Sequence, residues 1–123
     1  MQDFRELRVW QRGRGLTADI YRATALFPPD EQFGLTSQMR RAAVSIIANI
    51  AEGCGRAGAS DFARFLQMAA GSASELASHL IIARDLDYLD ANRQAPLIEE
   101  TAEIQRMLTV LIRRVRATGE KGP

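Results

Sequence analysis

The chain has 123 residues, 46% of them hydrophobic, and its 16 Lys and Arg nearly balance 15 Asp and Glu, for a formal net charge of +1. This length fits one compact domain, and so small a net charge argues against strong nucleic-acid binding by a single chain. One cysteine excludes an intramolecular disulfide, and one cysteine with one histidine argues against a structural zinc site.

At the N-terminus, charged residues occupy the positions where a secretion signal would carry an apolar run. The longest apolar stretch, residues 42–51, is roughly half the length that spans a bilayer. We therefore expect a cytoplasmic protein that does not engage a membrane.

Apolar residues recur at helical spacing over residues 4–25 and again over residues 36–53, which predicts two helices. Two consecutive prolines end the first helix, and a glycine-rich stretch at 53–58 ends the second and offers a left-handed cap. Gly13 and Gly15 weaken the first helix by about 1 kcal/mol each relative to alanine. The second helix is apolar around most of its circumference, which indicates burial on several sides.

A third helix is predicted from an N-cap at Ser60 to about residue 87, and a fourth from about residue 91 to residue 117. Pro96 lies in the first turn of the fourth helix or kinks it. The apolar residues of this helix follow a heptad seam: Leu97, Thr101, Ile104, Leu108, Leu111 and Val115.

Four amphipathic helices joined by short connections predict an all-α fold, an antiparallel up-down-up-down four-helix bundle over residues 1–117. The polar, glycine-containing residues 118–123 are expected to form a disordered tail. The predicted core contains Ile46, Ile50, Phe65, Leu76, Leu80, Leu108 and Leu111.

Groups that could carry catalysis or hold a metal are sparse. Cys54 lies among glycines after a helix rather than at a helix N-terminus, where a thiolate would be stabilised. Glu75 and His79 stand four residues apart on one helix face, but metal sites in bundles draw ligands from several helices. We therefore expect no catalytic residue, no metal and no cofactor.

A polar stripe on the apolar second helix has two interpretations. It is either a solvated face or a buried polar network that sets the register between helices. A buried carboxylate would need an arginine partner, for which Arg40 and Arg41 are the candidates. The candidate members of the network are Arg41, Ser45, Asn49, Glu52 and, from the third helix, Glu75.

The basic residues concentrate at the two ends of the chain, and Arg113, Arg114 and Arg116 cluster near the end of the fourth helix. This cluster either complements the helix dipole or forms a nucleic-acid patch. The second helix has more apolar circumference than one core consumes, and Trp10, Phe27 and Phe33 add large groups near chain bends. Part of this surface is expected to contact a neighbouring copy.

Four stretches in fixed order carry a resemblance to a known family: LRVWQ at 7–11, FPPDEQFGLTS at 27–37, QMRRAAVSIIANIAEG at 38–53 and GSASEL at 71–76. Together they resemble the four-helix bundles first noticed as proteins encoded in intervening sequences of bacterial 23S rRNA genes. That family includes the accessory variability protein of diversity-generating retroelements. The resemblance covers about residues 4–116.

The resemblance implies a homopentameric ring without catalytic residues. The retroelement member is a basic pentamer that binds a reverse transcriptase and nucleic acid. This sequence departs from the pattern at Ile47, where the family often has proline, at Cys54, where an aromatic residue is common, and in its near-neutral charge.

Composition and resemblance lead to one main expectation about function. The protein is expected to be a non-enzymatic bundle that self-assembles into a homo-oligomer, a pentamer, and acts as a scaffold or a module for a protein partner. The alternative is an accessory protein that binds RNA or DNA, or acts with a reverse transcriptase.

Overall fold

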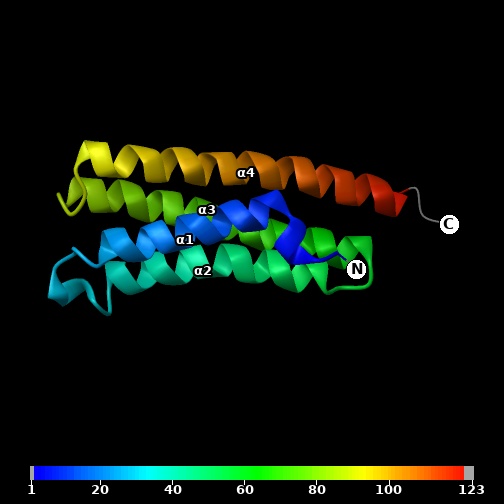
Figure 1. The fold of residues 1–123 in the computed structure, drawn as a ribbon, viewed down its shortest axis with the longest axis horizontal. Coiled ribbons are helices and arrows are strands. Elements are labelled where there is room, and N and C mark those ends of the chain that lie inside the picture. Colours follow the sequence, from blue (N-terminus) through cyan, green and yellow to red (C-terminus); the bar gives the residue numbers. More distant parts are fainter. Residues whose placement is uncertain (1, 121–123) are drawn as a thin grey trace.

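The computed structural model describes residues 2–120, and four long helices dominate it (Figure 1). The helices are α1 (Arg8–Thr24), α2 (Leu35–Cys54), α3 (Ala59–Asp85) and α4 (Ala91–Glu120). Two short 3-10 turns, η1 (Phe4–Glu6) and η2 (Pro29–Glu31), precede α1 and α2. Successive helices run in opposite directions, and the described part of the chain begins and ends at the end of the bundle that holds the α2–α3 turn. The predicted all-α, antiparallel four-helix bundle is confirmed.

The helix boundaries depart from expectation at several ends. The first segment starts as η1 and becomes α-helical only at Arg8, and α3 follows Gly58, so Ser60 lies in its first turn rather than at the N-cap. Pro96 lies inside α4, beyond its first turn. Helix α4 also continues through Glu120, three residues into the expected disordered tail, whose residues 121–123 lie outside the described part.

The core forms from the apolar stripes of all four helices. Small residues at the waist of α3, Ala69 and Ala73, are fully buried and let neighbouring helices approach closely. Thr101 is buried too, and its hydroxyl donates to the Leu97 carbonyl at 2.7 Å, so no polar group is left unpaired there. The predicted core residues are buried except Leu111, which is only partly covered: Ile46, Ile50, Phe65, Leu76, Leu80, Leu108.

At Gly13, helices α1 and α2 lie close together. A Cβ atom at this position would lie 2.7 Å from Cγ2 of Ile47, which is too close, so the Ile47 side chain or the helices themselves would have to shift. The helix-weakening glycine is therefore matched to a β-branched residue on the facing helix. Gly15, two residues later, faces open space.

The expected left-handed glycine cap of α2 is not used, because Gly55 has a φ of −82°. The one positive φ among the described residues is at Asp87, with φ 59°, just after α3. The backbone N–H of Asp87 donates to the Arg84 carbonyl and that of Tyr88 to the Ala83 carbonyl, which closes a Schellman-type turn. Asp is one of the few residues that tolerate this conformation, since its short polar side chain bonds locally.

Glu31 ties the α1–α2 connection to the α3–α4 turn. One carboxylate oxygen accepts from the Leu35 backbone N–H at 3.1 Å, at the start of α2, and the other accepts from the Tyr88 hydroxyl at 2.8 Å. These bonds, the backbone one first, lower the pKa of the Glu31 carboxyl, and donation to Glu31 raises the pKa of Tyr88. Phe27 packs against the Tyr88 ring with centroids 5.3 Å apart.

We expect Glu31→Gln to make the free energy of unfolding depend less steeply on pH in the acidic range. A carboxyl whose pKa is lower in the folded chain stabilises it above the unfolded pKa of about 4.3 and loses this effect as pH falls through the folded pKa. Denaturant midpoints measured from about pH 6 to pH 3 should therefore fall less steeply for the variant than for the wild type. The matched control, Glu99→Gln at an exposed residue of α4, should retain the wild-type slope. Identical slopes for wild type and Glu31→Gln would contradict this role.

Candidate functional site

A small polar network joins the middle of α2 to the middle of α3. The hydroxyls of Ser45 and Ser72 lie 2.8 Å apart, and the Asn49 amide donates to the Ser45 carbonyl at 2.9 Å and to its hydroxyl at 3.0 Å. All three side chains are half-buried. Ser45 and Asn49 are brought together as expected, whereas Ser72 was missed, because a serine in a run of small residues gives no periodic signal.

The other candidate members of the network do not join it. Glu52 pairs with Arg56, just after the end of α2, at 2.6 Å, and Glu75 faces His79, one turn away on α3, at 3.4 Å. Partners four residues away are favoured over partners on another helix, because bringing them together needs no further ordering of the chain. Arg41 is exposed, and within residues 2–120 its side chain makes no hydrogen bond or ion pair.

Arg40 turns toward α1 rather than toward a carboxylate. Its guanidinium donates to the Thr24 hydroxyl at 2.9 Å and lies 4.6 Å from the centre of the Tyr21 ring. The expected arginine–carboxylate pairing across helices therefore does not form at Arg40.

Several apolar side chains on the outer sides of α2 and α3 are exposed. Val44 on α2 is 40% exposed and Met68 on α3 is 47% exposed. Met68, Ile82 and Leu86 lie within about 40° of one another around α3 at 100° per residue. We call this surface the α2–α3 face: Val44, Ala48, Met68, Ile82 and Leu86.

The three aromatic residues expected near chain bends differ in how far they are buried. Trp10 packs edge-on against Phe4, with ring centroids 5.0 Å apart, and Phe27 is buried in the core. Phe33, in the connection before α2, is 89% exposed. Of the three, Phe33 alone presents its ring largely to solvent.

The arginine cluster of α4 splits between two sides of the helix. Arg113 and Arg116 line a cavity of about 380 Å³ between α3 and α4, together with Gln67. Arg114 lines cavities on the opposite side, next to Leu7. Residues one apart on a helix point about 100° away from each other, so three arginines close in sequence cannot share one face.

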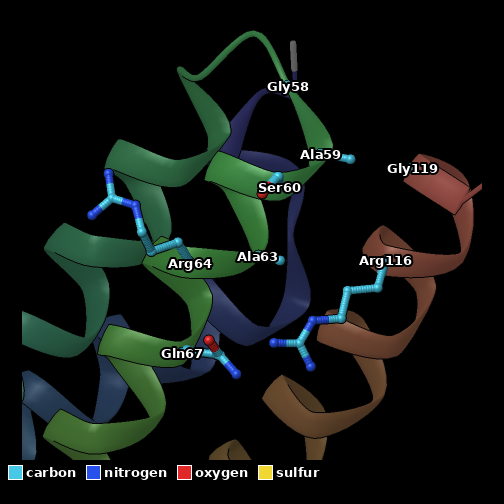
Figure 2. A pocket seen from close by; sticks show the side chains of 8 residues that line it. All are labelled: Gly58, Ala59, Ser60, Ala63, Arg64, Gln67, Arg116 and Gly119. Carbon is cyan, nitrogen blue, oxygen red and sulfur yellow. The ribbon is translucent and has the colours of Figure 1, made fainter. Parts of the chain in front are cut away.

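A second cavity, of about 710 Å³, continues this α3–α4 groove toward the start of α3. Figure 2 shows Arg116 reaching from α4 toward Gln67, while Arg64 points away from α4. Arg64 instead pairs with Asp61 at 3.1 Å. No described acidic side chain lines either cavity, so Arg113 and Arg116 are not neutralised within the groove.

The groups considered for catalysis remain apart. Cys54 is buried at the end of α2, and burial raises the pKa of its thiol, which favours the less reactive protonated form. Within residues 2–120, no group of three or more His, Cys, Asp or Glu side chains is placed to hold a metal ion. No helix in the described part of the chain combines the length and the apolar character needed to cross a bilayer.

Comparison with known proteins finds one matching family and a similar solved structure. The family described as 23S rRNA-intervening sequence protein matches residues 5–110. A crystal structure at 1.70 Å resolution is similar: a protein of unknown function from the S23 ribosomal protein family of Bacteroides thetaiotaomicron VPI-5482, with a TM-score of 0.77 and 22% identity, covering 85% of this chain and 97% of that one. No curated protein sequence matches significantly. Neither description names an enzymatic activity.

Proposed function

The chain belongs to the 23S rRNA-intervening sequence protein family, and from this premise we propose that it is a non-enzymatic scaffold that assembles with copies of itself in the cytoplasm. The subunits form a homo-oligomeric ring, with five copies as the family resemblance implies. The ring acts as a binding module for other macromolecules. The observation that carries the proposal is the exposed apolar surface of the α2–α3 face.

The α2–α3 face suits coverage by a neighbouring subunit. Val44 and Met68 expose apolar surface, which would be removed from contact with water when a subunit covers it. The polar groups between them, Ser45, Asn49 and Ser72, already bond to one another, so covering them leaves few unpaired donors. Glu75 likewise has His79 beside it.

Hydroxyl-radical footprinting tests which face is covered. We expect Met68 to be oxidised slowly at concentrations where the protein is assembled, and faster after dilution into the dissociated range. Phe33, which is 89% exposed and is not one of the residues of the face, serves as the control and should react at similar rates in both samples. Oxidation of Met68 at the same high rate at every concentration would contradict coverage of this face.

A second candidate function is favoured by the acid-free lining of the α3–α4 groove. Arg113 and Arg116 provide uncompensated charge there, although one chain carries only +1 overall. A ring would repeat this pair in every subunit, and each further contact with a long polyanion would be intramolecular. Such a protein would act as an accessory factor that binds RNA or DNA, alone or beside a reverse transcriptase.

We expect weak, salt-sensitive and sequence-independent binding to single-stranded RNA. The affinity should fall by about tenfold or more in the double variant Arg113→Gln/Arg116→Gln. Arg114→Gln, on the other side of α4, is the control and should bind much as the wild type does. Anisotropy of labelled RNA at low and moderate salt measures both. Equal affinities for all three proteins, or no dependence on salt, would remove the groove from consideration.

A further inference from the structure

Helix α1 is too short to cover the side of α4 that faces it. Helix α1 has 17 residues and α4 has 30, and both reach the end of the bundle that holds the α3–α4 turn (Figure 1). Before Arg8 the chain leaves this path, and the Gln2 N–H donates to the Cys54 carbonyl at the end of α2. The C-terminal part of α4 therefore lacks the neighbour that α1 provides elsewhere.

A groove follows α4 where this neighbour is missing. It consists of two cavities, of about 450 and 370 Å³, that share Leu7, Leu111 and Arg114 in their linings. Along α4 the linings run from Glu103 to Thr118, which at 1.5 Å per residue is about 22 Å, or four helical turns. Apolar side chains line much of it: Leu7, Val9, Phe62, Met107, Val110, Leu111 and Val115.

The charges around the groove are predominantly positive. Four arginines and two glutamates line it: Arg8, Arg56, Arg106, Arg114, Glu6 and Glu103. Arg106 is engaged by Glu103 at 2.7 Å, and Arg56 by Glu52. No ion pair joins Arg8 or Arg114 to an acidic side chain among those that the structure describes, so both are available to an anionic partner.

We propose that this α1–α4 groove is a docking site for an acidic amphipathic helix of another protein. The helix would take the place that a longer α1 would fill and bury apolar residues spaced i, i+4 against Leu111 and Val110. Its carboxylates would pair with Arg8 and Arg114 at the rim. The groove and the α2–α3 face share no residue. A ring joins each subunit to its two neighbours through two different surfaces, so the proposal requires that the second assembly surface lie outside this groove, which the light-scattering measurement tests.

The probe is a capped, fluorescein-labelled peptide of about 16 residues, built from Leu on one face and Glu and Ala elsewhere. We expect it to bind the full-length protein saturably in an anisotropy titration. Arg8→Glu/Arg114→Glu should weaken binding by about tenfold or more, because two favourable charge contacts become repulsive. A twin peptide with every Glu replaced by Lys should not bind.

The matched control is Arg113→Glu/Arg116→Glu, the same change of charge on the opposite side of α4, which should bind within about twofold of wild type. Equal losses in both double variants, equal binding of the acidic and basic peptides, or no saturable binding would overturn the proposal. Light scattering on the same samples should give unchanged oligomeric masses. A changed mass for Arg8→Glu/Arg114→Glu alone would assign the groove to a second copy of this chain and would also overturn the proposal.

Discussion

Leu108→Ala is expected to destabilise the bundle by about 2–5 kcal/mol. Leu108 is fully buried in the heptad seam of α4, where it packs with the core formed by the other helices. Truncation removes its apolar contacts and leaves a cavity that close-packed helices fill only in part. Denaturant unfolding at one fixed protein concentration measures the loss, since assembly would make stability depend on concentration.

Val110→Ala is the matched control, because Val110 lies on the same helix but is 45% exposed. We expect its effect to stay within about 0.5 kcal/mol. A loss below about 0.5 kcal/mol for Leu108→Ala would mean that the seam of α4 does not face the core.

Met68→Glu is expected to dissociate the proposed assembly. Met68 lies in the α2–α3 face, so a subunit seated there would bury a carboxylate without a partner. A cost of about 3 kcal/mol per interface weakens each contact more than a hundredfold. Because Met68 is 47% exposed within one subunit and lies outside the core, the fold itself should survive, and circular dichroism should show unchanged helicity.

Ile81→Glu provides the control for charge, since Ile81 is 52% exposed on the same helix but lies about 140° around it from Met68. Its sedimentation should match that of the wild type, whereas Met68→Glu should sediment as a single chain. Dissociation by both variants, or by neither, would show that the α2–α3 face does not direct assembly.

Most of the fold could be predicted from the sequence, because the helical spacing of apolar residues and the positions of the helix-ending Gly and Pro residues indicate the same four helices. The heptad seam of α4 holds from Leu97 through Leu108, but near the helix end Ile112 is buried while Leu111 is only partly covered. Leu111 falls where α1 no longer covers α4, and no periodic pattern encodes the length of a neighbouring helix. Helix α4 was predicted to end at residue 117 but continues through Glu120. The prediction stopped too early because Gly119 is a poor helix former when considered in isolation.

The candidate surfaces were harder to predict than the core. Ser45 and Asn49 follow helical spacing, but their link to Ser72 depends on how α2 and α3 align, which spacing within one helix does not specify. Glu52 and Glu75 pair with residues four positions away in the sequence, so the prediction of interhelical pairing was wrong for both. The arginine cluster of α4 divides between two grooves because neighbours in sequence diverge around a helix.

The molecular mass of the wild-type protein tests self-assembly most directly. Size-exclusion chromatography with multi-angle light scattering, at micromolar concentration in dilute buffer, should give about five times the 13.6 kDa mass of the chain. A single species of 13.6 kDa under these conditions would contradict the proposed scaffold.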